Sequence, residues 1–375
     1  MKKSFTLVGF LIILIGVLLS GCTSSAGIAT SWPGLAVSDE VAYVAFGDGV
    51  YAVSIQNGNK IWSYPAEPNK KVMYFATPAI SNDMVVVGNY NNELKAINSK
   101  NGLEQWGFNG ADDRYIAGAL IYDGKIYAPN ADSYLYVLDK DGELLWRFKT
   151  QKANWAAPVT NGKLLFLAPM DHSLYALDLD YQDDDLVRDE DGARTLVGKP
   201  IWSVDLGAAI FAEPLISDSG EQLFIGTLGG RFYSVDATNG KILWSFNAEG
   251  ESDDVWSSPV LVGNKLFFGD ANGKIYALSV ESGNELWPSA LDAGSPIIGG
   301  GVVMPESIGF PTVGGKLVVI NKEGKTLPTI SLDGKLYTKP VFVDGKQIIA
   351  ITSGDQLIVA LDENGREYWS FKPTE

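Results

Sequence analysis

Few residues in this chain are suited to catalysis. The sequence contains one cysteine, Cys22, and one histidine, His172, among 375 residues. A single cysteine excludes an internal disulfide, a cysteine-based zinc site and covalently attached haem, and a single histidine excludes a multi-histidine metal centre. His172 lies between Asp171 and Ser173, but adjacent residues in a turn cannot adopt the geometry of a Ser-His-Asp triad. We therefore expect a solvated turn histidine and no catalytic residue.

Carboxylates cluster in one segment, residues 178–199, where they could bind Ca²⁺ through oxygen ligands. The weak candidates for such ligands are Asp183, Asp185, Asp189 and Asp191. Their spacing does not follow the EF-hand loop, and acidic runs are usually solvated. The sequence therefore favours a solvated, mobile acidic loop over a metal site, and we expect neither a metal nor another cofactor.

Aromatic residues form a set that suits the binding of another protein. They recur three residues before a proline that marks each repeat, and Tyr115 adjoins the same position in a repeat with Ala119 in place of the proline. The set consists of Phe75, Tyr115, Trp155, Phe211, Trp256 and Tyr337. Aromatic residues with acidic neighbours are typical of docking surfaces, because they supply contact area at little entropic cost. Two alternatives stay open: the rings bind a partner at a channel mouth, or they pack as core between sheets.

Two charged residues stand one position before such prolines. Glu213 precedes Pro214, and Lys339 precedes Pro340. If the strand that follows each proline lines a central channel, both side chains could face that channel. They are therefore candidate ligand contacts.

The first 22 residues indicate where the protein is located. Two lysines precede an apolar run from Phe5 to Leu19, and small residues precede Cys22. This pattern is typical of an export signal, and an apolar run of about 15 residues is too short for a permanent membrane span. The small residues followed by cysteine also resemble the bacterial lipobox, in which the thiol receives diacylglycerol and becomes the new N-terminus.

We therefore predict a signal peptide over residues 1–21, and a lipidated Cys22 with a flexible tether over 22–31, which anchor the protein to a membrane. Thr23 follows the cysteine in place of aspartate. By resemblance to proteobacterial lipoproteins, this residue implies an outer membrane, on the side that faces the periplasm. In a cell without an outer membrane, the anchor would lie on the outer face of the cytoplasmic membrane.

The charge of the chain restricts its partners. The formal net charge is −16, and removal of the signal peptide with its two lysines would make it −18. Such a surface repels phosphate, so nucleic acid is not an expected partner.

Internal repetition indicates the elements that position these residues. Tryptophans recur at intervals of 40 to 56 residues, and the last interval of 82 is two units of 41 with Leu327 in the intermediate position. The tryptophans are Trp62, Trp106, Trp146, Trp202, Trp244, Trp287 and Trp369. The second marker keeps the same spacing as Pro33, Pro78, Ala119, Pro158, Pro214, Pro259, Pro296 and Pro340.

The pattern within each unit predicts four short strands, because four runs rich in β-branched and aromatic residues are bounded by glycine, asparagine or aspartate. Eight such units close a ring without long exposed edges. We therefore predict an all-β fold, an eight-bladed β-propeller of four-stranded antiparallel blades, as one domain over 32–375. An insertion, 179–199, falls between the third and fourth strands of blade 4 and should project from the face opposite the blade-joining loops. A β-solenoid, the competing architecture, has shorter rungs and no tryptophan in each unit.

The segment 234–244, Ser-Val-Asp-Ala-Thr-Asn-Gly-Lys-Ile-Leu-Trp, resembles the tryptophan-docking motif of propellers of the pyrroloquinoline quinone (PQQ) type. Weaker copies end at Trp202, Trp287 and Trp369, and the resemblance covers 32–372. The glycine permits a positive backbone angle in the turn, and the tryptophan would bury roughly 150–250 Å² against the next blade. The seven tryptophans are therefore predicted to be structural.

Two families with this frame resemble the chain: the quinoprotein dehydrogenases, and the lipoprotein subunit of the outer-membrane β-barrel assembly machinery. The first implies PQQ, a Glu, Asn and Asp cluster for Ca²⁺ and often two adjacent cysteines, but this chain has only Cys22. The second agrees better in length, lipobox and compact loops, and implies no catalytic site.

We therefore predict a lipid-anchored, extracytoplasmic, non-catalytic scaffold that binds envelope proteins, acts in envelope protein assembly and exists as a monomer or in a hetero-complex. The alternatives are a PQQ-dependent sugar or alcohol dehydrogenase and a binder of envelope polysaccharide.

Overall fold

The computed structural model describes residues 32–373, except for 180, 182–185, 190, 197–199, 249–253 and 353–355. The described residues belong to one compact unit, Trp32–Glu375. The predicted signal peptide, Cys22, the tether, Asp183 and Asp185 all lie outside the described residues. Over the described ranges all the regular elements are β-strands, and no helix there has the length and apolarity needed to cross a membrane.

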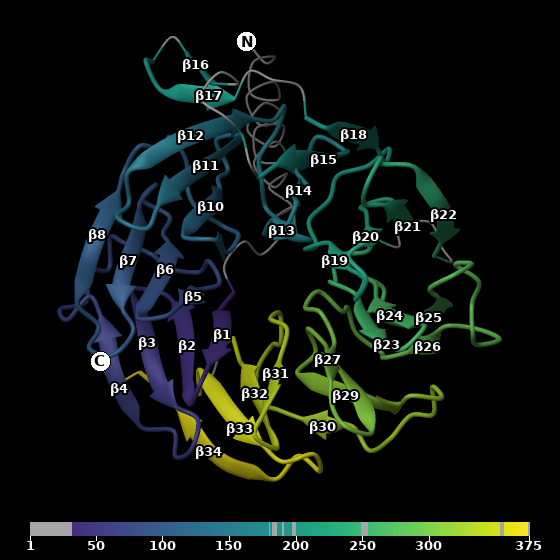
Figure 1. Cartoon of the computed structure of the whole chain (residues 1–375). Helices are drawn as coiled ribbons and strands as arrows, with labels where there is room; N and C mark the ends of the chain where they lie inside the picture. The colour runs from purple at the N-terminus through teal and green to yellow at the C-terminus, as the bar shows by residue number, and fades with distance from the viewer. Residues whose placement is uncertain are drawn as a thin grey trace, which may run out of the picture. The chain divides into compact units, whose positions relative to one another are not determined.

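The strands form eight antiparallel sheets around a ring, named blades 1 to 8 in chain order (Figure 1). Blade 1 contains β1 (Gly34–Ser38), β2 (Val41–Phe46), β3 (Gly49–Ser54) and β4 (Lys60–Tyr64). Blade 2 contains β5 (Ala79–Ser81), β6 (Met84–Gly88), β7 (Leu94–Asn98) and β8 (Glu104–Phe108). Blade 3 contains β9 (Leu120–Tyr122), β10 (Lys125–Pro129), β11 (Tyr134–Asp139) and β12 (Leu144–Lys149). Blade 4 contains β13 (Val159–Thr160), β14 (Leu164–Leu167), β15 (Ser173–Asp178) and β18 (Trp202–Asp205).

The second half of the ring repeats this order. Blade 5 contains β19 (Leu215–Ile216), β20 (Gln222–Gly226), β21 (Arg231–Asp236) and β22 (Ile242–Asn247). Blade 6 contains β23 (Val260–Val262), β24 (Lys265–Gly269), β25 (Lys274–Ser279) and β26 (Leu291–Asp292). Blade 7 contains β27 (Val302–Val303), β28 (Ser307–Pro311), β29 (Lys316–Asn321) and β30 (Ile330–Ser331). Blade 8 contains β31 (Val341–Val343), β32 (Lys346–Ala350), β33 (Ile358–Leu361) and β34 (Glu367–Phe371). The predicted eight-bladed propeller is confirmed.

Tight turns set the register of the strands. Between β9 and β10, Asp123 and Gly124 have φ angles of 48° and 70°, and a two-residue turn with positive φ at both positions matches the twist of the strands it joins. Between the third and fourth strands of blades 1, 2, 3, 5 and 8 the register shifts. In blade 2 this irregularity follows Ala96, which lies opposite Trp106, so a small residue leaves room for the indole.

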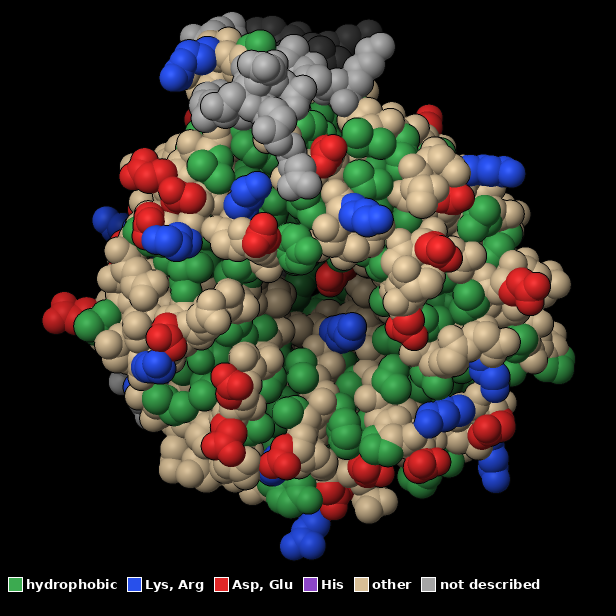
Figure 2. Space-filling view, in the orientation of Figure 1, with side chains coloured by type: hydrophobic (Ala, Val, Ile, Leu, Met, Phe, Trp, Pro, Cys, Tyr) green, Lys and Arg blue, Asp and Glu red, His purple; other side chains and the backbone are tan. Residues whose placement is uncertain are grey.

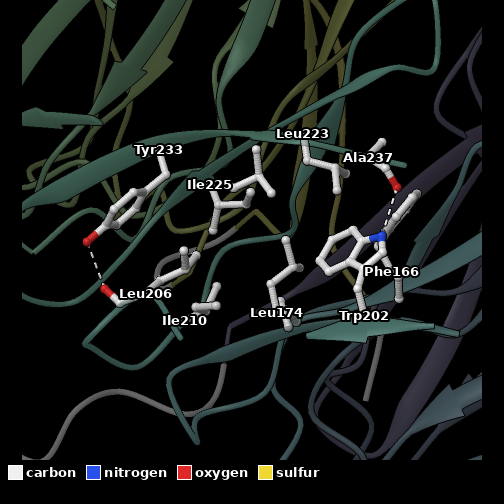
Figure 3. Close-up of a cluster of buried hydrophobic side chains, with 13 residues drawn as sticks. Phe166, Leu174, Trp202, Leu206, Ile210, Leu223, Ile225, Tyr233 and Ala237 are labelled. Atoms are coloured by element: carbon white, nitrogen blue, oxygen red, sulfur yellow. Dashed lines mark hydrogen bonds between the residues drawn. The ribbon is translucent and has the colours of Figure 1, made fainter. Parts of the chain in front are cut away.

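The hydrophobic core lies between the blades. The buried side chains of the described residues fall into eight clusters, and each of them joins two neighbouring blades. Figure 3 shows the cluster between blades 4 and 5, where Trp202 and Leu174 face Leu223 and Ile225. Because each blade is covered on both faces, its middle strands are apolar at consecutive positions, as in the buried Val85, Val86 and Val87 of β6.

The ring closes through side chains, because blade 1 begins at its innermost strand, β1, and blade 8 ends at its outermost strand, β34. One core cluster joins Val44 and Ile55 of the first blade to Ile348 and Ile358 of the last. No described strand is exchanged between these two blades, so packing and hydrogen bonds alone hold this junction.

The structure corrects two repeat positions in blade 7. Gly301 precedes β27 as Pro259 precedes β23, so the second marker of this blade is Gly301 and not Pro296. In blade 4 the amide of Ile201, the residue before Trp202, donates to the Ala176 carbonyl on the third strand. In blade 7 the amide of Leu327 donates to the Val319 carbonyl in the same way, so the next residue, Pro328, occupies the tryptophan position. Spacing alone misplaced both residues, because the turns of this blade differ in length.

The insertion is also different from the expected loop. Two strands, β16 (Leu186–Arg188) and β17 (Arg194–Leu196), form a hairpin, and β17 pairs in parallel with β12 of blade 3 (Figure 1). The chain of blade 4 thereby extends the sheet of blade 3 to six strands. The predicted solvated loop on one face of the ring is wrong for the described part, because this hairpin follows the outer edge of a blade.

Candidate functional site

Five of the tryptophans bond the next blade. Each indole Nε1 donates to the first carbonyl after the third strand of that blade, over 2.7 to 3.1 Å. The five are Trp62, Trp106, Trp202, Trp244 and Trp369. The indoles also lie against a turn glycine, such as Gly102, where a Cβ would be 2.9 Å from the Trp62 ring.

Trp146 and Trp287 contact the next blade differently. Trp146 packs edge-on against Tyr181 of the insertion at 5.5 Å, and the Trp287 ring covers the turn glycine Gly324. In both blades a lysine at the start of the second strand donates to the first carbonyl after the third strand of the next blade. At five other junctions the tryptophan indole bonds this carbonyl. Lys125 Nζ lies 3.3 Å from the Leu179 oxygen, and Lys265 Nζ lies 3.2 Å from the Lys322 oxygen. This role of lysine was not predicted from the sequence.

The acidic insertion contributes an ion pair. The guanidinium of Arg147, on β12, donates to Asp189 at 2.6 Å and to Asp191 at 2.7 Å, and it stacks on the Tyr134 ring at 4.2 Å. The Arg147 side chain is only 7% exposed. These two aspartates therefore neutralise a shielded arginine, and no group of three or more potential metal ligands occurs among the described residues.

His172 lies in the turn between β14 and β15 with a φ of 75°. Its neighbour Asp171 accepts hydrogen bonds from the Gln151 amide, the Ser173 amide and the Tyr175 hydroxyl, each at 2.9 to 3.1 Å. The carboxylate of Asp171 therefore fixes the turn to the blade-joining loop.

The central channel collects residues from all eight blades. It encloses about 340 Å³ and is lined mainly by small and aromatic residues at the start of each blade. Of the predicted aromatic set, the structure brings four to this lining: Trp155, Phe211, Trp256 and Tyr337. Figure 2 shows the hollow at the centre of the ring, with acidic and basic side chains next to it.

The aromatic residues of the channel form two contact groups. Phe211 lies between Trp155, at 5.1 Å, and Trp256, at 4.9 Å. Tyr337 stacks on Trp32 at 6.3 Å. Trp32 was not predicted as part of this set, although it stands one position before Pro33, as Glu213 stands before Pro214.

Two predicted members of the set belong to the core. Tyr115 is 1% exposed and its Cβ occupies the space above Gly88, where a second Cβ would lie only 2.1 Å away. Its position, four residues before the repeat marker, is buried in blades 2 to 8, whereas the next residue faces the channel in most of them. Phe75 has the channel position but is 8% exposed, because its ring packs between Phe46 and Tyr90. Neither is available as a docking residue.

Glu213 and Lys339 both line the channel. Desolvation by the surrounding protein raises the pKa of the Glu213 carboxyl above its ordinary value, while the charge of Lys339 opposes the shift. The side chain nevertheless stays accessible to channel water. Water in the channel therefore limits the rise of this pKa.

The channel lining does not match the donor set that the quinoprotein resemblance implies. A calcium ion with PQQ would need Glu, Asn and Asp oxygens together, but the lining contains the single carboxylate of Glu213 and neither asparagine nor aspartate. The carboxylates of Asp132 and Asp171, in the turns between the second and third strands of blades 3 and 4, accept hydrogen bonds from loop amides and tyrosine hydroxyls. We therefore derive no redox chemistry from this site.

Comparison with solved structures supports the fold. The chain is similar to BamB from Moraxella catarrhalis, with 17% identity, a TM-score of 0.68 and coverage of 87% of this chain and 92% of the other. It is equally similar to the computationally designed Ika8 protein, with 15% identity, a TM-score of 0.68 and coverage of 88% and 96%. At these identities the likeness shows the fold alone. No match was found among curated proteins.

A family model gives more than the fold. The model described as "Outer membrane protein assembly factor BamB" matches residues 23–126 and 192–296, which together are more than half of the chain. The matched ranges include blades 1, 2, 5 and 6 completely, and they cover the tryptophans Trp62, Trp106, Trp202, Trp244 and Trp287. The chain therefore belongs to the family of the outer membrane protein assembly factor BamB.

Proposed function

We propose that this protein is a lipid-anchored, extracytoplasmic scaffold that binds other envelope proteins during their assembly. The observation that carries the proposal is membership of the BamB family, whose description names the assembly of outer membrane proteins. The export signal and Cys22 of the sequence support the anchor and its location. The partner is an envelope protein, bound in a hetero-complex.

The face that carries the blade-joining loops is suited to docking, because hydrogen bonds order it in advance. The amide of Asp112, in the loop before blade 3, donates to Asp132 in the β10–β11 turn at 2.9 Å. The amide of Gln151 donates to Asp171 in the corresponding turn of blade 4, also at 2.9 Å. A loop held in one conformation loses little entropy when a partner binds.

Site-specific cross-linking tests the docking face. A photo-reactive amino acid at Asp112 or Gln151, both exposed, should give a discrete protein adduct in membranes of the native cell. Glu143 is the matched control, because it is an exposed acidic residue of the same blade in the β11–β12 turn on the other face. Equal adducts from Glu143, or none from Asp112 and Gln151, would contradict the proposal.

The anchor has a separate test. Replacement of the acceptor thiol in Cys22→Ala should release the protein from the membrane fraction, because the acyl chains supply the membrane affinity. Fractionation followed by immunoblotting measures the change. Membrane association that is unchanged in this variant would show that another part of the protein binds the membrane.

A further inference from the structure

The channel holds two opposite charges at equivalent positions of different blades. Glu213 stands two residues before the first strand of blade 5, and Lys339 two residues before the first strand of blade 8. Among the described residues that line the channel, they are the ones that carry full charges. The other blades place uncharged residues at this position, among them Thr77 and Ser258.

These two charges do not neutralise each other directly. Among the described ion pairs, all within 4.0 Å, none joins Glu213 to Lys339, and the two interact only through the longer-range electric field. The Lys339 stem passes over Gly300 of blade 7, where a Cβ would lie 3.3 Å from the lysine Cδ. The same Cβ would lie 3.0 Å from the backbone carbonyl oxygen of Ser258, so the Lys339 side chain lies beside blade 6. Glycine at this position leaves space for the lysine inside the channel.

The rest of the lining is suited to an apolar body. The rings of Trp155, Phe211 and Trp256 form one continuous aromatic wall, and Phe211 is in the same loop as Glu213. Aromatic faces attract cations as well as apolar groups. A volume of about 340 Å³ is near the lower end of typical ligand pockets and is too small for a folded domain.

We propose that the channel binds a small zwitterion, an amino acid or a short peptide with an apolar side chain. Its ammonium group contacts Glu213 and the aromatic wall, its carboxylate contacts Lys339, and its apolar side chain occupies the remainder of the channel. Each charge of the ligand thus meets an opposite charge, and hydrogen bonds between charged groups are stronger than those between neutral ones. This site does not depend on the scaffold role proposed above.

Calorimetric titration of the full chain tests the proposal. The probes are phenylalanine, tryptophan and the dipeptide Phe-Phe, and comparison of the amino acids with the dipeptide distinguishes the two sources of a zwitterion. N-acetylphenylalanine and phenylalanine amide each lack one charge, and each should bind at least about tenfold more weakly than phenylalanine. Glu213→Gln should weaken the binding of phenylalanine by a similar factor but leave the already weak binding of N-acetylphenylalanine unchanged. Lys339→Met should likewise weaken the binding of phenylalanine and leave the weak binding of phenylalanine amide unchanged.

Two further variants separate binding from folding. Thr77→Trp adds a large ring to the channel lining while both charged residues are kept, and it should abolish binding, whereas Glu143→Gln, at an exposed position outside the lining, should leave binding unchanged. Circular dichroism establishes that each variant is folded. The proposal is overturned if none of the zwitterions binds the unaltered protein, if Glu213→Gln and Lys339→Met bind them normally, or if PQQ occupies the channel in their place.

Discussion

The junction between blades 8 and 1 should be the most sensitive point of the ring. Trp369 bonds the Ile55 carbonyl at 2.9 Å and lies over Gly58, where a Cβ would be 2.8 Å from the indole. Its indole is buried, with 8% exposure. At every other junction the chain itself connects the blades, whereas here contacts such as the Thr338 hydroxyl bonding the Pro33 carbonyl must do so.

We predict that Trp369→Ala lowers the free energy of unfolding by about 3–5 kcal/mol, the usual loss for a buried tryptophan. The milder Trp369→Phe keeps a ring but leaves the Ile55 carbonyl without its donor, and should cost about 1–3 kcal/mol. Because whole proteins are stable by only about 5–15 kcal/mol, either loss is easily measured by urea denaturation followed by far-UV circular dichroism.

Trp202→Ala is the matched control. Trp202 has 9% exposure and a 3.1 Å bond to the Ala237 carbonyl, and it joins two blades that are consecutive in the chain. Both variants should lose similar free energy globally. Hydrogen exchange should differ: in Trp369→Ala the amides of β1–β4 and β31–β34 should exchange faster before global unfolding, because this junction can open locally. A loss below about 1 kcal/mol for Trp369→Ala, or the same exchange pattern in both variants, would refute the reasoning.

The remaining predictions concern single contacts. Arg147→Ala should lower the free energy of unfolding by about 1–3 kcal/mol, because Asp189 Oδ2 and Asp191 Oδ2 lose the guanidinium that they bond. Limited proteolysis should then cleave within 178–199; resistance equal to that of the unaltered protein would contradict this. Gly102→Ala should cost more than about 1 kcal/mol, because φ is 73° and the new Cβ would meet the Trp62 ring, and an unchanged urea midpoint would be inconsistent with it. For Glu213, the raised pKa means that the folded protein binds this proton more tightly than the unfolded chain, so stability falls as pH rises from the ordinary value of 4.5 through the raised one. Glu213→Gln should therefore be more stable than the unaltered protein at pH 7 and nearly equal to it at pH 4. Lys339 and Tyr337 are the other titratable residues of the channel lining. A stability difference between the two proteins that shrinks as pH rises would contradict the raised pKa of Glu213.

The number and type of the blades could be predicted from the sequence, because each unit repeats the same local signals. The turn glycine four residues before Trp62, Trp106, Trp244 and Trp369 is written in the sequence, and so is the alternation of short apolar runs and turns. These signals act over fewer than about ten residues, so they do not depend on the arrangement of the rest of the chain. The residues that predict an export signal are local in the same sense.

Spacing alone could not tell which aromatic residues are free. Tyr115 and the channel residue Ile116 are neighbours in the chain, yet the first is pressed onto Gly88 of the adjacent blade. Successive side chains of an extended segment point in opposite directions, so an error of one position exchanges core for channel. Phe75 has the correct position, and only the rings of Phe46 and Tyr90 beside it decide that it is buried.

The sequence by itself determined the all-β repeat, the eight blades and the position of the insertion, and it predicts a lipobox at Cys22. The tertiary structure decided which distant residues meet. Arg147 and Asp189 are 42 residues apart in the chain, and Glu213 and Lys339 belong to different blades, yet the ring brings each pair into one site. Closure of the ring fixes these meetings, since it depends on packing summed over all eight blade interfaces and on no local pattern.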